Sequence, residues 1–345
     1  MLGKNIKYYR LKKNMTKKDL AEAINMTPMA ITYYENDERQ PSMETIKNIA
    51  NVLGVKVTDF LANTDNSLHF SHGKFRKGTK LGIMMQEYIK ESVEEYFNRF
   101  FQTLSFLGGQ QILETPPKIN AIQWTDDIEN AAEKLREYLG ISMSGPVNNL
   151  VEILENKGIL VYFIEIDNHY FSGMNGTVNG LPYIVINSKM STARIRSTIV
   201  HEIVHFAFEW PESLSDKQEE ELATAIGGAF LFSKKDAIRE LGYKRNSISR
   251  AMTITCKEYG ISLLLLAKRA KICGIINDSA ERDFYIKAGK LGWRKSEPDW
   301  GITEEEPTLF KQLVFRAVSE EEISVQKGAE LLKSSYDSVA KACFI

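Results

Sequence analysis

The sequence predicts a multidomain, mainly α-helical protein with a helical N-terminal module, a central α+β domain containing a small β-sheet, and a helical C-terminal region. Apolar residues recur at intervals of three and four along most of the chain, which is typical of amphipathic helices. Between residues 159 and 186, short β-branched runs bounded by turn residues replace that pattern. With 345 residues, the chain exceeds what one hydrophobic core usually fills, so two or three domains are expected.

Composition and charge exclude several classes of protein. The chain is 43% hydrophobic and 26% charged, as globular proteins are. It has no apolar run of about 18 residues and no apolar signal segment, so we expect a cytoplasmic protein without a membrane partner. Three widely spaced cysteines favour reduced thiols over a disulfide framework. A net charge of −1 gives no general attraction to nucleic acid, so any DNA contact must come from a local surface.

Residues 1–64 are predicted to form five short helices. Thr16 and Thr27 are suitable N-caps for the second and third helices, and Pro28 stands at the first helical position, where proline is tolerated. Two helices joined by a three-residue turn are typical of helix-turn-helix proteins, which insert the second helix into the DNA major groove. A helical bundle without a ligand would show the same periodicity. The five helices are expected over residues 4–13, 17–24, 28–35, 42–53 and 57–61.

Residues 15–61 read MTKKDLAEAINMTPMAITYYENDERQPSMETIKNIANVLGVKVTDFL and resemble the Xre/Cro-type repressor domain nearly end to end. The resemblance implies a double-stranded DNA operator as partner. Such modules usually bind two half-sites as dimers, so a homodimer is expected. On the matched positions, the residues expected to face bases are Pro28, Met29, Thr32 and Tyr33, and those expected near phosphates are Lys17 and Arg39.

Residues 65–115 are predicted to contain a linker and a long connector helix. The polar start of this region indicates the linker, in which His69 and His72 are expected to be solvated side chains rather than a metal pair. Residues 81–105 carry an apolar stripe at helical spacing, which would either pack on a neighbouring domain or pair two protomers. The segment ETPPKI at 114–119 marks the next boundary.

Residues 116–285 are predicted to form the α+β domain. Asn179-Gly180 is a strong signal for a two-residue hairpin, so the sheet is expected to be small and either mixed or antiparallel. Helices are expected over residues 125–139 and 147–156, and strands over 159–166, 173–178 and 181–186.

The stretch 197–210, STIVHEIVHFAFEW, carries the chemistry of this domain. His201 and His205 lie four residues apart on one helical face and can share one metal ion, with Glu202 beside the open coordination position. This is the H-E-x-x-H arrangement of zinc hydrolases, in which the glutamate acts as the general base. The sequence therefore predicts Zn²⁺ as cofactor and Glu202 as the catalytic residue. A helix with two solvated or capped histidines is the alternative.

A catalytic zinc ion needs a third protein ligand, and the acidic helix that starts at Asp216 is the nearest source. We predict Glu220 as this ligand, because small residues follow it on the same helical face and allow a close approach. Glu219 and Glu221 are expected to point about 100° to either side. A neighbouring glutamate stays open as the ligand, since helix boundaries shift by a residue. The alternative is a solvated acidic first turn on the helix dipole.

The order and spacing of these segments resemble the ImmA/IrrE family of metallopeptidases, in the form fused behind an Xre-type domain. Matching segments include GPVNNLVEILENKGILVYF, LPYIVINSKMSTARIRSTIVHEIVHFAF and EEELATAIGGAFLFSK. The resemblance implies a gluzincin-like fold in which His201, His205 and a glutamate of the next helix bind zinc. It also implies cleavage of a partner repressor protein and control of stress, prophage or mobile-element genes. The chain departs from the family pattern at Val204, where glycine is favoured, and at Leu222, where a second glutamate is usual.

Residues 286–345 are predicted to form a helical scaffold or interaction domain. Ser324 opens one helix, and Ser334-Ser335 precede a closing helix, so this tail imitates a second helix-turn-helix. The acidic run Glu304–Glu306 argues against a DNA-facing surface here.

Two classes of function follow from the sequence. The first is a DNA-binding transcription regulator with a zinc-dependent endopeptidase domain. The second is a non-proteolytic DNA-binding repressor, or the antitoxin of a toxin-antitoxin pair, whose metal domain is structural or sensory. Glu202 favours the enzyme, because a purely structural zinc site needs no general base.

Overall fold

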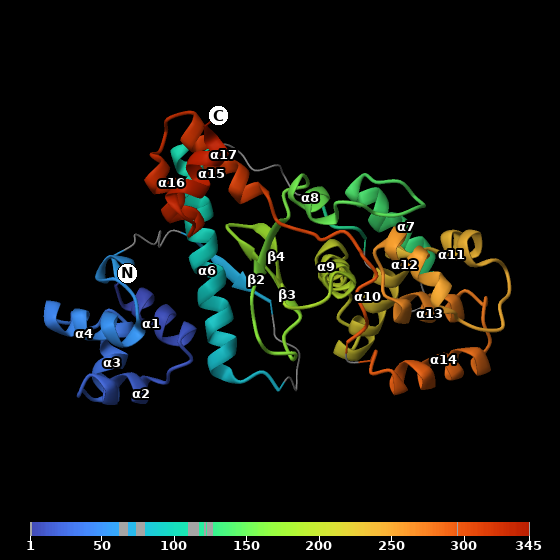
Figure 1. Ribbon diagram of the computed structural model, residues 1–345, viewed down its shortest axis with the longest axis horizontal. Coiled ribbons are helices and arrows are strands. Elements are labelled where there is room, and N and C mark those ends of the chain that lie inside the picture. Colours follow the sequence, from blue (N-terminus) through green and yellow to red (C-terminus); the bar gives the residue numbers. More distant parts are fainter. Residues whose placement is uncertain are drawn as a thin grey trace. The chain divides into compact units, whose positions relative to one another are not determined.

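The computed structural model of this protein describes residues 2–61, 68–73, 80–109, 117–120, 122, 127–294 and 296–344. It confirms the predicted fold class, because the chain is mainly helical and carries a mixed sheet in its middle domain (Figure 1). The chain divides into two compact units, residues 1–110 with 310–345 and residues 111–309. The boundaries of the four predicted domains stay a prediction. Among the residues described, no helix is long and apolar enough to cross a membrane.

The first unit begins with five helices. Thr16 and Thr27 cap α2 and α3 as predicted, since their hydroxyl oxygens accept hydrogen bonds from the backbone N–H groups of Asp19 and Ala30. The turn between α2 and α3 contains Asn25, whose φ of 53° is left-handed, a conformation that asparagine tolerates better than most residues. The bounds are α1 Leu2–Lys12, α2 Lys17–Ala23, α3 Pro28–Glu35, α4 Met43–Leu53 and α5 Val57–Phe60.

A buried ion pair joins α1 to α3. Arg10 Nε lies 2.5 Å from Glu35 Oε1, and Arg10 Nη2 lies 3.0 Å from Glu35 Oε2. The two side chains are only 3% and 1% exposed. The remaining guanidinium nitrogen, Nη1, donates to the carbonyl oxygen of Met15 at 2.7 Å. The pair is therefore bidentate and nearly shielded from water, which makes the loss of either partner costly.

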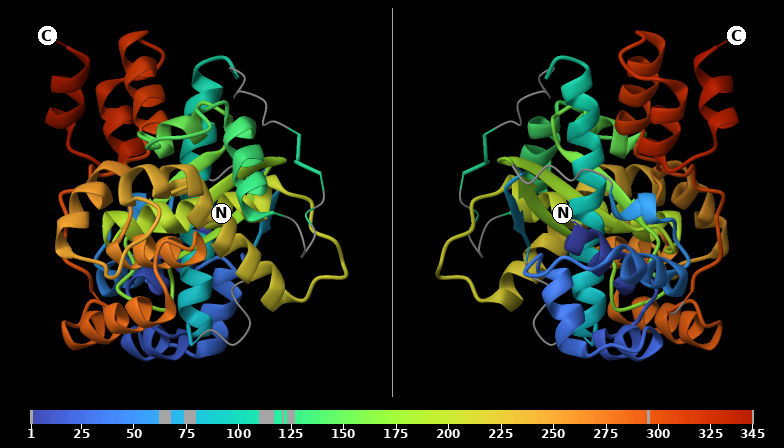
Figure 2. Two further views of the ribbon diagram at one scale, coloured as in Figure 1. Left: turned by 90° about the vertical axis from the view of Figure 1, so that its right-hand side faces the viewer. Right: turned by 90° about the vertical axis from the view of Figure 1, so that its left-hand side faces the viewer.

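The rest of the first unit is built on one long helix, α6, which the turned views in Figure 2 show in teal. The ring of Phe310 on α15 lies against Tyr96 and Phe100 of α6, with centroid distances of 5.2 and 5.7 Å. Ile89, Val93 and Phe97 of the predicted apolar stripe are fully buried, so the stripe packs within its own chain. The elements are β1 Phe70–His72, α6 Ile83–Phe106, α15 Leu309–Ser319, α16 Val325–Leu332 and α17 Tyr336–Cys343.

The linker predicted before α6 and the boundary predicted at 114–119 lie largely outside the described residues. Within the described part, His72 is not the solvated side chain that we expected. Its Nε2 atom lies 3.0 Å from Glu94 Oε1 on α6, and the imidazole is only 14% exposed. The Ser- and Gly-rich surroundings of His72 gave no sign of this partner, because Glu94 is 22 residues away in the chain.

The second unit contains the sheet. Strand β2 pairs in parallel with β4, and β3 pairs antiparallel with β4, so the sheet is mixed. Asn179 and Gly180 have φ angles of 49° and 81° and form the predicted hairpin turn between β3 and β4. The bounds are α7 Ile128–Leu139, α8 Leu150–Glu155, β2 Leu160–Ile164, β3 Gly173–Val178, β4 Leu181–Asn187, α9 Thr192–Ala207, α10 Asp216–Leu231, α11 Lys234–Leu241, the 3₁₀ helix Arg250–Met252, α12 Thr253–Tyr259, α13 Leu263–Ile272 and α14 Asp278–Lys290.

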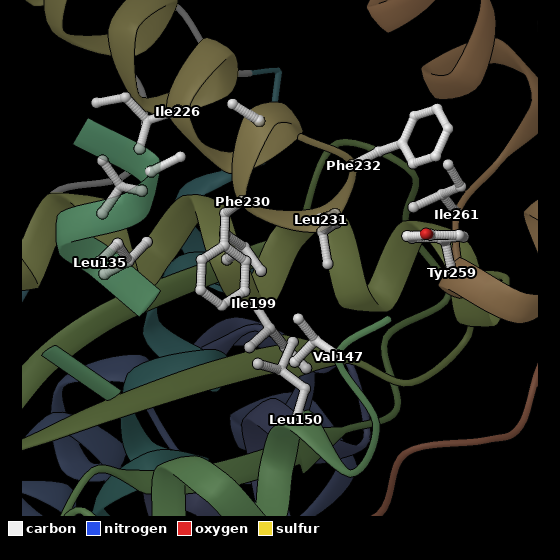
Figure 3. Close-up of a cluster of buried hydrophobic side chains, with 14 of the residues drawn as sticks. Leu135, Val147, Leu150, Ile199, Ile226, Phe230, Leu231, Phe232, Tyr259 and Ile261 are labelled. Carbon is white, nitrogen blue, oxygen red and sulfur yellow. The ribbon is translucent and has the colours of Figure 1, made fainter. Parts of the chain in front are cut away.

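Helix α9 lies between the sheet and α10 and contacts both (Figure 1). Figure 3 shows the apolar core formed there, with Phe230 of α10 directed toward Ile199 of α9, and Leu135 of α7 beside them. All three side chains are fully buried. Packing on two sides holds α9 rigidly, so the polar residues near its C-terminal end have defined positions.

Candidate metal centre

Two histidines of α9 and one glutamate of α10 converge on a single point. His201 Nε2 lies 3.1 Å from His205 Nε2 and 3.4 Å from Glu220 Oε2, and His205 Nε2 lies 3.5 Å from Glu220 Oε1. One ligand atom from each of the three residues lies within 4.8 Å of the other two. Ligand atoms about 2.0 to 2.1 Å from a tetrahedral zinc ion lie about 3.4 Å apart, so these side chains fit a zinc ion.

Small residues of α10 face α9 beside this cluster, at ordinary packing distance. A Cβ atom placed on Gly227 would lie 3.4 Å from Val200 Cγ1 and 3.8 Å from the backbone nitrogen of His201. One helical turn earlier, the hydroxyl of Thr224 lies 3.4 Å from His201 Nδ1. The face of α10 that carries small residues is therefore the face that contacts α9, the helix of the two histidines. Val204, where the family favours glycine, is fully buried in the hydrophobic core, and the ligand atoms converge beside it.

The outer nitrogen of His205 is held by a second carboxylate. Glu219 Oε1 accepts a hydrogen bond from His205 Nδ1 at 2.9 Å. Such a bond orients the ring and leaves the Nε2 lone pair directed toward the metal position. We expected Glu219 to point away from the site, and this was wrong. Glu219 does point in a different direction from Glu220 around the helix axis. This direction brings its carboxylate to Nδ1 of His205, whereas Glu220 faces Nε2.

Glu202 is buried and contacts strand β3. Asn175 Nδ2 donates a hydrogen bond to Glu202 Oε2 at 2.7 Å, and Glu202 is 8% exposed. Two residues earlier on β3, a Cβ atom on Gly173 would lie only 2.9 Å from Thr198 Cγ2 of α9. The missing side chain thus lets the strand approach the helix, which places Asn175 beside Glu202. Sequence reasoning missed Asn175, whose only signal was its position two residues after a glycine in a predicted strand.

The electrostatics of the site favour a cation. Burial, the largest influence, lowers the pKa of His205, but the hydrogen bond with Glu220 and the negative charges of Glu202 and Glu220 oppose it. Together they raise the pKa of His205 above its ordinary value. Three carboxylates, those of Glu202, Glu219 and Glu220, therefore surround two imidazoles, and a divalent cation would balance this excess of negative charge.

The residues predicted to contact DNA lie on or beside α3. Met29 is 58% exposed at the start of this helix, next to the exposed Pro28. Lys17 Nζ lies 3.3 Å from the hydroxyl of Thr32, which is half-buried. The guanidinium of Arg39 lies 5.7 Å from the centre of the ring of Tyr33. All six predicted residues therefore occupy one neighbourhood of the first unit, at the N-terminus and along one side of α3.

Comparison with known proteins adds an independent line of evidence. Family models match this chain in two places, as a helix-turn-helix over residues 6–60 and as an IrrE N-terminal-like domain over residues 154–271. The chain joins a helix-turn-helix domain to an IrrE N-terminal-like domain. The predicted resemblance is thereby confirmed. The IrrE N-terminal-like domain includes α9 and α10 and hence the whole histidine and glutamate cluster.

Two proteins of Bacillus subtilis (strain 168) are similar to parts of the chain. The HTH-type transcriptional regulator ImmR is 27% identical over 134 residues, which are 37% of this chain and 96% of ImmR. The uncharacterized HTH-type transcriptional regulator YqaE is 33% identical over 70 residues, which are 20% of this chain and 60% of YqaE. No solved structure matches the chain. The helix-turn-helix domain implies DNA binding.

Proposed function

We propose that this protein is a DNA-binding transcription regulator whose IrrE N-terminal-like domain is a zinc-dependent endopeptidase. Its substrate is a repressor protein, and cleavage controls stress, prophage or mobile-element genes. The observation that carries the proposal is the convergence of His201, His205 and Glu220 at distances that suit zinc, with Glu202 next to them. These three residues would hold a zinc ion, with Glu202 left free to act as the general base.

Each residue of the site has a separate role in the proposed reaction. A zinc ion bound here supplies Lewis acidity, which polarises a peptide carbonyl and lowers the pKa of water. Glu202 accepts a proton from the attacking water and passes it to the leaving amine. Asn175 holds one oxygen of Glu202, which leaves the other oxygen available to the proton. Glu219 keeps the ring of His205 in the orientation that the metal needs.

The alternative is a non-proteolytic repressor or antitoxin with a structural or sensory metal domain. A structural zinc site is closed by four protein ligands and has no use for a general base. Here three ligand atoms converge, and a glutamate that is not one of them is held beside them by its own hydrogen bond. This arrangement supports the enzyme.

The test compares Glu202→Gln with wild-type protein. Each is expressed together with repressors encoded nearby, and repressor cleavage, bound zinc and reporter activity are measured. We expect Glu202→Gln to keep its zinc and its DNA binding but to lose cleavage by roughly 10²- to 10⁴-fold. Glu221→Gln, an exposed glutamate on α10, is the matched control and should cleave normally.

A third variant separates the two classes of function. His201→Ala should lose both zinc and cleavage, because it removes a ligand. If Glu202→Gln regulates the reporter like wild type while His201→Ala does not, the metal domain is structural or sensory and the peptidase proposal fails. A loss of regulation in both variants, accompanied by intact repressor, supports the peptidase.

A further inference from the structure

The C-terminal helices repeat the geometry of the N-terminal helix-turn-helix position by position. Helices α2 and α16 begin after the N-caps Thr16 and Ser324, whose hydroxyl groups accept a hydrogen bond from a backbone N–H three residues on. Nine positions after each cap, Asn25 and Lys333 adopt left-handed conformations with φ of 53° and 51°. Two positions later, the next N-caps open α3 and α17, and both of those helices are eight residues long. The two segments therefore align without a gap.

The buried positions of the two segments also correspond. Ile31 of α3 and Val339 of α17 occupy equivalent positions, and both are 0% exposed. In α2 and α16, Ala21 and Ala329 are equivalent and buried. A Cβ atom on Gly328 would lie 2.8 Å from Val318 Cγ2, so α16 packs tightly against α15. Helix α15 thus lies against α16, and it also contacts α17, where Cys343 Sγ lies 3.8 Å from the carbonyl oxygen of Phe315 of α15.

We propose that α15–α17 are a second helix-turn-helix module and that α17 binds duplex DNA as its recognition helix. The residues at the start and along the outer face of α17 are accessible. Tyr336 is 53% exposed, and Asp337 and Lys341 are exposed as well. These positions correspond to Pro28, Met29 and Tyr33 of the first module, which the Xre-type pattern places against bases. A recognition helix presents its N-terminal residues to base edges in the same way.

Charge permits this binding mode. Residues 324–344 contain three lysines and two acidic residues, so their net charge is +1. The equivalent residues 16–36 contain two lysines and three acidic residues, so their net charge is −1. The second module is therefore no more acidic than the first over the helix-turn-helix itself. The acidic run Glu304–Glu306, which argued against DNA, belongs to the other unit, where Glu305 is 8% exposed and pairs with Arg196, while Glu304 and Glu306 are exposed.

One difference between the modules predicts that the second binds DNA more weakly. Lys12 and Lys13 precede the cap of α2, whereas Glu320 and Glu321 occupy the equivalent positions before the cap of α16. Lysines at such positions attract phosphates, and glutamates repel them. The second module is thus expected to act together with the first rather than alone.

Helix α6 holds the two modules at one spacing within the first unit. Lys7 of α1 pairs with Glu91 at 2.7 Å, and Lys333 at the end of α16 pairs with Glu95 at 2.9 Å. Lys333 Nζ also lies 3.4 Å from the hydroxyl of Tyr8 on α1. Because both modules pack against neighbouring turns of α6, one chain presents two recognition helices at a fixed separation. The DNA site should therefore consist of two sequence blocks with one spacing.

The experiment selects binding sites for full-length protein from a random-sequence duplex DNA library. We expect two conserved blocks at a constant distance. Selection with Lys341→Glu should retain one block and lose the other, and its affinity for the two-block duplex should fall about 10-fold, since each lost base or phosphate contact costs roughly 1 to 3 kcal/mol. Met29→Glu should lose the opposite block. Lys311→Glu, on the exposed side of α15, is the matched control and should behave like wild type.

Two further variants keep the outcome interpretable. Lys341→Arg preserves the charge and should restore the second block, which separates a contact with DNA from a defect in folding. Glu321→Lys should increase affinity, because it imitates the first module. A single conserved block for wild-type protein, or an unchanged block pair with Lys341→Glu, would overturn the proposal and leave α15–α17 as a scaffold or a protein-binding module. None of these outcomes depends on peptidase activity.

Discussion

In the first unit, a buried positive charge is paired with a buried negative charge. In the metal centre, several negative charges lie close together. In the first unit, the guanidinium of Arg10 and the carboxylate of Glu35 satisfy each other through two hydrogen bonds. In the metal centre, Glu220 approaches both imidazoles, Glu219 contacts His205, and the negative charge of Glu202 also acts on His205. Like charges at close range repel one another, and Glu219 and Glu220 are only partly shielded from water, so this arrangement costs some stability until a cation binds.

We therefore expect the buried pair to contribute to the stability of the fold and the carboxylate cluster to contribute to metal binding. Removing one partner of a buried pair leaves an uncompensated charge in the interior, which should unfold the module. A cluster that is completed by a cation contributes to binding, and its loss should change affinity while the fold persists.

Replacing Glu35 with Gln should have the largest effect. The substitution leaves the buried guanidinium of Arg10 without its counter-charge, which costs about 3 to 5 kcal/mol. We expect the helix-turn-helix module to melt at a much lower temperature and DNA binding to be lost, while zinc content stays normal. Thermal unfolding followed by circular dichroism measures this effect. Glu38→Gln, three residues on and exposed, is the control and should leave the melting temperature unchanged. If the two variants melt at the same temperature, the ion pair between Arg10 and Glu35 has no structural role.

Replacing Glu219 with Gln should weaken the metal site without unfolding the protein. The carboxylate orients His205, and loss of such a partner usually costs about 10- to 100-fold in metal affinity. Competition with a chromogenic zinc chelator gives the affinity, and thermal unfolding of the metal-free protein reports the fold. Glu221→Gln, on the same helix but exposed, should keep wild-type affinity. If Glu219→Gln binds zinc as tightly as wild type does, the hydrogen bond to His205 has no part in the site.

Acid should affect the paired carboxylate Glu94 in a defined direction. Burial, the largest influence, raises the pKa of Glu94, but hydrogen bonds from His72 and Lys4 outweigh it and lower the pKa from 4.5 to about 2. Because the folded pKa lies below the unfolded one, ionised Glu94 stabilises the protein fully above pH 4.5 and progressively less as the pH falls toward about 2. The effect should be modest, since water reaches part of the pair.

The measurement compares urea unfolding of wild type and Glu94→Gln at about pH 3 and about pH 6, on either side of the unfolded pKa. Wild type should lose stability between the higher and the lower pH. The variant should lose less, because it has no carboxylate to protonate at this position. An identical pH dependence in the two proteins would show that Glu94 is not responsible.

Much of the fold was predictable from local sequence signals. The caps Thr16 and Thr27 and the Asn179-Gly180 turn appear in the structure where the sequence places them. These features depend on residues within a few positions of one another, so their physical cause is visible in the sequence itself. The pairing of β2 with β4 is parallel and crosses over an intervening strand, and no local signal distinguishes it from an antiparallel neighbour.

The metal site was predictable only in part for the same reason. His201 and His205 share one helix, so helical geometry alone puts them on one face. Asn175 and Glu219 reach the site from other elements, and their roles depend on how β3 and α10 approach α9. The approach of β3 depends on Gly173, because a side chain there would collide with Thr198 of α9. A single sequence does not reveal which surface a glycine leaves open.

The ion pair between Arg196 and Glu305 has a consequence for the order in which parts of the chain fold during synthesis. Arg196 lies on α9, the helix of the two histidines, and is 4% exposed. It pairs with a glutamate that follows it by 109 residues. Glu305 also accepts hydrogen bonds from the backbone N–H groups of Leu150 and Val151 at the start of α8. As the chain leaves the ribosome from its N-terminus, α9 emerges long before this glutamate. The helix that carries the histidines therefore acquires this buried counter-charge only after residue 305 has been made, so the metal domain is completed later than the N-terminal helix-turn-helix.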